Sequence, residues 1–178
     1  FGIGKATGIE LQGEERGIVG KPWESDWSET LFFTTAFGQG IAITPLQIVN
    51  AYSAIVNGGH LMEPYIVAEE RRPDGTVNTH EPEVIRDVIK EETSAQMREM
   101  LHQVVEQRYE AYPQVPGYNI GAKTGTAQVP SPEGGYVEDT TIASIVGFGP
   151  VEDPQFVVLV KIDEPRETPW GETAAGPA

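Results

Sequence analysis

The sequence contains no cysteine and only three histidines among its 178 residues. Without cysteine the chain can form no disulfide, no thiol nucleophile and no cysteine-ligated metal site. The histidines, His60, His80 and His102, are far apart, and neither an H-E-x-x-H motif nor a set of carboxylates at ligand spacing accompanies them. We therefore expect no metal centre, and the sequence implies no other cofactor.

Positive charge is also scarce. Twelve Lys and Arg residues are outnumbered by 27 Asp and Glu residues, so the formal net charge is −15 at pH 7. The long-range field of such a chain repels nucleic acid and anionic lipid, and we expect neither as a partner. No stretch has the apolar length of a membrane span or the pattern of a signal peptide.

Hydrophobic residues make up 39% of the chain, which is enough to build the core of one domain. The chain begins with Phe1 and stops at Gly176-Pro177-Ala178, so we expect a piece of a larger domain, cut at both ends. The first 29 residues show no sustained period and are expected to form a loop, with Trp23 and Trp27 packing beneath it.

Two segments carry clear helix signals. One has Thr44 as a predicted N-cap, Pro45 at the first helical position and Gly58-Gly59 as a stop. It is apolar nearly all round, which predicts a largely buried helix. The second helix is expected from Glu91 to about Gln107. It is amphipathic, and the apolar residues of its core face follow helical spacing: Met97, Met100, Leu101, Val104 and Val105.

The remaining segments favour strands. Asp74-Gly75 between two extended runs predicts a hairpin, and a short strand is expected at 84–89. Three longer strands are expected at 119–128, 141–149 and 156–163, the last two apolar enough to be covered on both faces. The stretch 129–138 is expected to be a loop. Short connections favour antiparallel neighbours in this order, with 119–128 on an edge. Together these elements indicate an α+β fold, an antiparallel sheet flanked by helices.

The stretch 117–128, GYNIGAKTGTAQ, places a lysine, two threonines and a glycine in succession: Lys123, Thr124, Gly125 and Thr126. A positive charge beside two hydroxyls is suited to holding a small anionic group. One interpretation is a phosphate loop, because the stretch is one substitution short of G-x-x-x-x-G-K-[ST]. That loop needs a glycine in place of Ala122 and a helix after the lysine, and Gly125 interrupts such a helix.

The second interpretation is the Lys-Thr-Gly element of the penicillin-recognising serine enzymes. Several neighbouring segments occur with it in a fixed order: Ala36-Phe37-Gly38-Gln39-Gly40, Thr44-Pro45-Leu46-Gln47, Gly117-Tyr118 and Thr126-Ala127-Gln128. In this combination the chain resembles the C-terminal part of the transpeptidase domain of class B, high-molecular-weight penicillin-binding proteins. The resemblance runs from Thr7 to Gly171. It implies the penicillin-binding protein and β-lactamase-like fold, incomplete at both ends.

The resemblance also implies a function. Such proteins are peptidoglycan D,D-transpeptidases, which cross-link stem peptides ending in D-Ala-D-Ala through a serine acyl-enzyme and are targets of β-lactam antibiotics. They act beside other cell-wall synthesis proteins at the extracytoplasmic face of the bacterial cell membrane. An N-terminal anchor would then lie upstream of residue 1.

The resemblance assigns roles to residues of the motif. Lys123 would supply positive potential and orient the serine of the family's middle motif, while Thr124 and Thr126 would donate hydrogen bonds to the substrate carboxylate. The backbone N–H of Thr126 would be one of two oxyanion-hole donors. Gly125 would let the substrate come close. Gln39, between two glycines, is a further candidate for facing the cleft. From the residues alone, Lys123 could instead protect an edge strand from aggregation.

The nucleophile of the family is not in this chain. None of the six serines has a lysine three residues on, and no Ser-x-Asn occurs. We therefore expect the chain alone to be unable to form an acyl-enzyme. Two other interpretations stay open. One is a D,D-carboxypeptidase or β-lactamase of the same superfamily, which matches the segments before the motif less well. The other is a catalytically silent sensor or scaffold module of a cell-wall complex.

Overall fold

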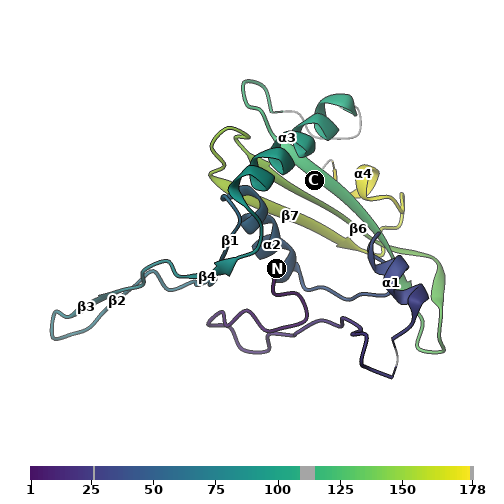
Figure 1. The fold of residues 1–178 in the computed structure, drawn as a ribbon, viewed down its shortest axis with the longest axis horizontal. Helices are drawn as coiled ribbons and strands as arrows, with labels where there is room; N and C mark the ends of the chain where they lie inside the picture. The colour runs from purple at the N-terminus through teal and green to yellow at the C-terminus, as the bar shows by residue number, and fades with distance from the viewer. Residues whose placement is uncertain (26, 109–114, 177–178) are drawn as a thin grey trace.

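The computed structural model describes residues 1–25, 27–108 and 115–176 (Figure 1). Within them the chain forms helices and strands in the order α1 Glu29–Thr35, α2 Pro45–Val56, β1 His60–Met62, β2 Glu69–Arg71, β3 Val77–Thr79, β4 Val84–Asp87, α3 Glu91–Gln107, β5 Gly121–Pro130, β6 Tyr136–Gly149, β7 Phe156–Asp163 and α4 Gly171–Ala174. This mixture confirms the α+β class. The segment 109–116, for which the sequence predicts a loop between the second helix and the sheet, lies mostly outside the described residues.

The central sheet is antiparallel and has the order β5-β6-β7. Both the predicted order and the edge position of β5 are confirmed. The β5–β6 hairpin is longer than expected, because pairing continues to Pro130 opposite Tyr136. The prediction of a loop over 129–138 was therefore wrong at both ends. Gly134 and Gly135, with φ of 96° and 71°, take up the left-handed backbone of the tight turn.

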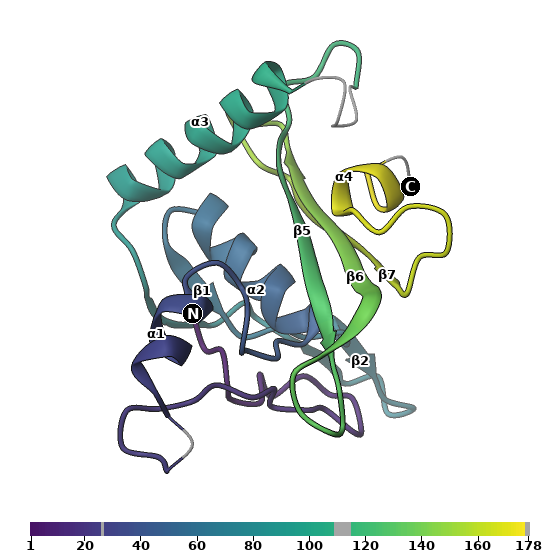
Figure 2. The same ribbon diagram turned by 90° about the vertical axis from the view of Figure 1, so that its right-hand side faces the viewer.

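Helices cover both faces of this sheet: Figure 2 shows α2 and α3 on one side and α4 on the other. On the α2 and α3 side the core contains Val56, Leu101, Phe148 and Val151. The second cluster joins the end of α3 and the end of α4 to the sheet through Val105, Ala122, Ala143, Ile145 and Ala175. The second half of β6 is buried as predicted, whereas β7 is not. Phe156 and Val158 are 56% and 51% exposed, because β7 is the other edge of the described sheet.

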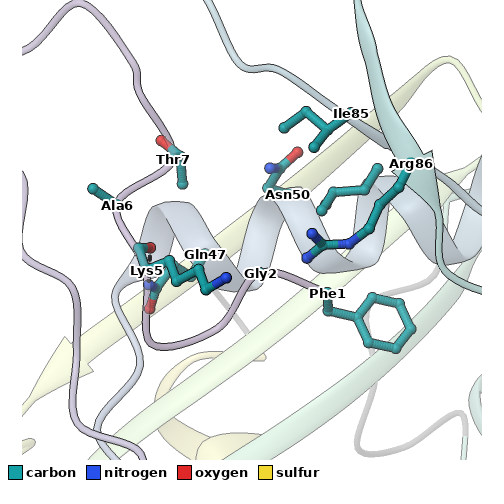
Figure 3. A pocket seen from close by; sticks show the side chains of 10 residues that line it. Phe1, Gly2, Lys5, Ala6, Thr7, Gln47, Asn50, Ile85 and Arg86 are labelled. Carbon is teal, nitrogen blue, oxygen red and sulfur yellow. Dashed lines mark hydrogen bonds between the residues drawn. The ribbon is translucent and has the colours of Figure 1, made fainter.

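Helix α2 begins and ends where the sequence predicts. The Thr44 hydroxyl accepts the N–H of Gln47, and the Gln47 side chain accepts the N–H of Thr44 in return. Apart from Pro45, every residue of α2 is buried or half-buried, which confirms the expected core helix. Gln47 is 2% exposed, and its Nε2 donates to the carbonyls of Lys5 (2.8 Å) and Arg16 (2.9 Å). The N-terminal segment is thereby fixed to α2 (Figure 3).

Helix α3 also has the predicted bounds, but part of its expected core face is wrong. Leu101 and Val105 are buried, whereas Met100 is 59% exposed. Ser94 is the buried polar residue of the helix, with 1% of its surface exposed. Its hydroxyl donates to the carbonyl of Ile55 at 2.6 Å and accepts the N–H of Gly58 at 3.1 Å. Hydrogen bonding to the end of α2 therefore helps to decide which face of α3 points inward.

The predicted hairpin at Asp74-Gly75 is formed by β2 and β3, and Figure 1 shows it extending away from the rest of the fold. The Asp74 carboxylate accepts the N–H of Thr76 at 2.9 Å, and Gly75 has a φ of 87°. The short strand expected at 84–89 is β4, which pairs with β1.

Near the N-terminus one expectation is wrong and one helix was not predicted. Trp23 is 80% exposed and does not pack beneath a loop. The sequence interpretation also missed α1, although Ser28 caps it by accepting the N–H of Leu31 at 3.1 Å. None of the α1 residues is buried in the described structure, so no apolar period marks the helix in the sequence.

Candidate functional site on the β5 edge strand

Lys123, Thr124, Gly125 and Thr126 are extended residues in the middle of β5. Within the described sheet β5 pairs only with β6, so its other edge is open. A phosphate loop requires the lysine at the start of a helix. Because Lys123 lies within a strand, the phosphate-loop interpretation was wrong.

The backbone N–H and C=O groups of Thr124 and Thr126 point toward the open edge of β5. A Cβ on Gly147 would lie 3.8 Å from the Cβ of Ala122, its partner in the ladder. Such closeness is typical of the antiparallel pairs that exchange no hydrogen bonds with each other. Pair types alternate along the ladder, so Thr124 and Thr126 belong to the same type as Ala122. Their N–H and C=O groups therefore point away from β6.

Two hydrogen bonds agree with this orientation. The ammonium of Lys123 donates to the carbonyl of Thr124 at 3.0 Å, which requires that carbonyl to be reached from outside the sheet. The hydroxyl of Ser144, on β6, donates to the carbonyl of Gly125 at 3.4 Å, so this carbonyl points the other way. The N–H of Thr126 is thus oriented as an oxyanion-hole donor at the open edge has to be.

Side chains of the motif alternate between the two faces of the sheet. Gly121 faces Phe148 and Leu101, so Lys123 and Gly125 lie on the α2 and α3 side. Thr124 and Thr126 lie on the α4 side, where the hydroxyl of Thr126 accepts the N–H of Gly171 at 2.9 Å. Lys123 is exposed, and its ammonium reaches the edge of the sheet. The lysine and the two hydroxyls therefore approach the same open edge from opposite faces.

Gly125 has little need to be glycine for packing within this chain. A Cβ there would lie 2.8 Å from the Ser144 hydroxyl oxygen, which can move by rotation about its side-chain bond. The outer side of Gly125 is exposed. The expected reason for the glycine, close approach by a substrate, is therefore compatible with its surroundings.

Gln39 is not brought to this strand by any contact among the described residues. It is half-buried in the turn after α1, and its N–H donates to the carbonyl of Thr34 at 3.1 Å. Figure 2 shows α1 standing apart from β5. The structure thus unites Lys123, Thr124, Gly125 and Thr126 and leaves Gln39 as an unsupported candidate.

Two hollows lie elsewhere on the molecule. A cavity of about 120 Å³ between the N-terminal segment, α2 and β4 is lined by Lys5, Gln47, Asn50 and Arg86 among others (Figure 3). A groove of about 460 Å³ at the start of β5 is mainly apolar, with Tyr118, Phe148 and Phe156 in its wall. Neither is lined by the Lys-Thr-Gly-Thr residues.

Over residues 1–25, 27–108 and 115–176, no three His, Asp or Glu side chains gather as metal ligands would. In the same ranges, no helix has the length and apolarity needed to cross a bilayer.

The contacts of residues 169–171 with β5 and β6 were not predicted from the sequence. Gly171 binds Thr126, and Thr141 donates its hydroxyl hydrogen to the carbonyl of Pro169 at 2.6 Å. The resemblance extended as far as Trp170-Gly171 but assigned no role there. No local signal marks this contact, because it joins residues 45 positions apart.

An antiparallel sheet with helices on both faces and Lys-Thr-Gly-Thr on an open edge strand is the arrangement of the penicillin-recognising class of proteins. The chain belongs to the penicillin-binding protein transpeptidase domain family, whose model matches residues 1–178. Stage V sporulation protein D of Bacillus subtilis is 45% identical over 180 residues, which are 99% of this chain and 27% of that protein. Peptidoglycan D,D-transpeptidase FtsI of Escherichia coli is 31% identical over 173 residues, 93% of this chain and 26% of that protein.

Solved structures agree with the family. Penicillin-binding protein 3 from Mycobacterium tuberculosis superposes with a TM-score of 0.84 at 33% identity, covering 98% of this chain and 40% of that one. The same protein has been solved in complex with aztreonam and with ampicillin. The chain spans about a quarter of the length of the curated relatives named above. The resemblance to class B penicillin-binding proteins is confirmed, together with the fold that it implied.

Proposed function

We propose that this chain is the substrate-binding and oxyanion-hole part of a serine-type peptidoglycan D,D-transpeptidase. Its acyl donor is a stem peptide ending in D-Ala-D-Ala, and β-lactams compete for the same site. The serine nucleophile, its lysine and the middle motif come from sequence upstream in the same transpeptidase domain. No cofactor or metal takes part.

One observation carries this proposal: Lys123 to Thr126 lie extended on an open sheet edge, with the Thr126 N–H directed outward. A peptide can add to such an edge as a further strand. Its terminal carboxylate then meets two hydroxyl donors and an ammonium, which are suitable partners for a carboxylate leaving water. The reacting carbonyl meets the Thr126 N–H, and loss of one such donor typically lowers a rate by about a hundredfold or more.

The direct test uses the full-length protein that contains this chain. Incubation with a fluorescent penicillin should give a covalently labelled band, and unlabelled ampicillin should prevent the labelling. A peptide ending in D-Ala-D-Ala should release D-alanine when an acceptor amine is present. Absence of both reactions in a folded full-length protein contradicts the proposal. The 178-residue chain alone should remain unlabelled.

The alternative function is a non-catalytic sensor or scaffold, which would bind a peptide at the open edge of β5 without reacting with it. The rest of the coding sequence distinguishes the two. Ser-x-x-Lys followed by Ser-x-Asn supports the enzyme, and their absence supports the scaffold.

The cellular setting is part of the same proposal. We place the protein at the extracytoplasmic face of the bacterial cell membrane, held by an upstream anchor, beside other cell-wall synthesis proteins. A periplasmic or surface-accessible tag on the full-length protein tests the location. In-cell crosslinking followed by identification of the captured proteins tests the partners.

A further inference from the structure

The hydroxyl of Thr126 has one hydrogen-bond partner in the described part of the chain, the backbone N–H of Gly171 at 2.9 Å. A threonine hydroxyl carries one hydrogen and two acceptor lone pairs. The N–H of Gly171 occupies a lone pair and leaves the hydroxyl hydrogen to point elsewhere. Thr126 is exposed, so that hydrogen is accessible to a ligand.

Gly171 approaches the strand more closely than any residue with a side chain could. A Cβ at this position would lie 2.3 Å from the carbonyl oxygen of Gly125 and 2.8 Å from that of Ser144. Both are backbone atoms of paired strands, so neither can rotate away as a flexible side chain would. Only glycine allows the N–H of residue 171 to reach Thr126 in this geometry.

Other contacts hold α4 in place without involving Thr126. The hydroxyl of Thr141 donates to the carbonyl of Pro169 at 2.6 Å, just before the helix. Arg108 and Glu172 form an ion pair at 3.1 Å. Ala175 is fully buried in the cluster that contains Val105 and Ala122. The position of the Gly171 N–H is therefore set by the fold, independently of the hydroxyl that it meets.

We propose that Gly171 is a positioning residue for substrate binding: its N–H orients the Thr126 hydroxyl so that the hydroxyl donates toward the carboxylate at the open edge of β5. This inference rests on the proposed function. A carboxylate is an acceptor only, so it requires the hydroxyl hydrogen rather than its lone pairs. An accepted hydrogen bond also polarises the hydroxyl and strengthens the one that it donates.

A double-mutant cycle in the full-length protein tests the coupling. The measured quantity is the second-order rate constant of acylation by a fluorescent penicillin that carries a carboxylate. Thr126→Val removes the hydroxyl while keeping the branched shape, and exchange of Gly171 for glycolic acid removes the N–H donor without adding a Cβ that would press on the Gly125 carbonyl. Each change should lower the rate constant about tenfold or more, the usual order for losing a hydrogen bond to a charged group. The double variant should react no more slowly than Thr126→Val alone.

Conservative backgrounds separate positioning from folding. Thr126→Ser keeps a hydroxyl, so the glycolic acid exchange at Gly171 should lower its rate constant by the same factor as in the wild type. Glu167→Gln changes an exposed residue of the segment before α4 and should leave acylation within about twofold, the scatter expected for exposed surface changes.

The outcomes separate this inference from the proposed function. If the folded wild-type protein is not labelled by penicillin and does not act on D-Ala-D-Ala peptides, both are overturned. If the wild type is labelled but the glycolic acid exchange at Gly171 slows Thr126→Val as much as it slows the wild type, only the role of Gly171 is overturned, because the residue then acts through the fold. A loss that depends on the hydroxyl at position 126 supports the role.

Discussion

The ammonium of Lys123 donates a hydrogen bond to the carbonyl of Thr124 at 3.0 Å. This contact holds the positive charge at the open edge of β5, although the side chain starts on the face opposite the two threonine hydroxyls. On a chain with a net charge of −15, a local cation is needed to bring a carboxylate to this place. The contact thus favours an anion-binding role for Lys123 over that of a strand lysine that only protects an edge.

Replacing that cation should weaken acylation. In the full-length protein, Lys123→Gln should lower the acylation rate constant with penicillin by about 10- to 100-fold, because a charge-assisted contact is lost. The salt dependence of the rate should also shrink, since screening acts on the charge that was removed. The rate constant measured at low and high NaCl tests both effects. Lys161→Gln, on β7 and paired with Asp163, is the control. An equal loss in the two variants would contradict a specific role for Lys123.

Gln47 should be more important for stability than any other polar side chain of α2. Gln47→Leu removes the capping bond to Thr44 and leaves the carbonyls of Lys5 and Arg16 without their partner. We expect a loss of about 2–4 kcal/mol, since each unsatisfied group costs roughly 1–3 kcal/mol. The thermal midpoint measures it. Gln103→Leu, an exposed change on α3, should shift the midpoint little. Equal midpoints for the two variants would show that the Gln47 contacts contribute nothing.

Acid should loosen the N-terminal segment through Glu14. Hydrogen bonds from the side chain and backbone of Thr7 and from the Gly8 N–H hold the pKa of Glu14 below its ordinary value of 4.5. A lowered pKa in the folded state stabilises the fold above the unfolded-state pKa, and that contribution disappears as the pH falls through the folded-state value.

The stabilising effect of Glu14 should therefore be constant from pH 7 to about pH 5 and decline below pH 4.5. Thermal midpoints of the wild type and Glu14→Gln should differ at pH 7 and converge in acid. The exposed neighbour gives the control, Glu15→Gln. A difference between wild type and Glu14→Gln that persists unchanged at pH 3 would show that the carboxylate charge is not responsible.

The elements predicted correctly are those whose signals are local. Thr44 with Pro45 fixes the start of α2, and short connections fix β5 beside β6. Helix α4 escaped prediction because it has four residues and no side-chain cap, and its position depends on Gly171 meeting a strand 45 residues away. Such a contact leaves no trace in spacing or periodicity.

The candidate site shows the same difference between local signals and long-range contacts. Lys123 to Thr126 are consecutive, so one strand assignment places all four at the open edge. Gln39 could be connected with them only through the fold, and none of its described contacts makes that connection. The prediction that Trp23 packs beneath a loop was wrong for a related reason. Aromatic character predicts burial only where other residues cover the side chain, and 80% of the Trp23 surface is exposed here.

An added methyl group should destabilise the fold at Gly121 of β5, whereas at Gly125 of the same strand it should slow acylation. At Gly121 a Cβ would lie 2.4 Å from the Phe148 ring and 3.3 Å from the Leu101 Cβ. Overpacking in Gly121→Ala should therefore lower the free energy of unfolding of the full-length protein by about 1–3 kcal/mol, seen as a lower thermal midpoint. At Gly125 a Cβ meets only the Ser144 hydroxyl oxygen, which can rotate, so Gly125→Ala should leave the midpoint nearly unchanged. Its methyl group would nevertheless stand where a substrate approaches the edge strand, and we expect acylation by penicillin to fall about tenfold or more, the effect of a misplacement near 1 Å. A normal acylation rate in a stable Gly125→Ala protein would mean that substrate does not pass over this glycine.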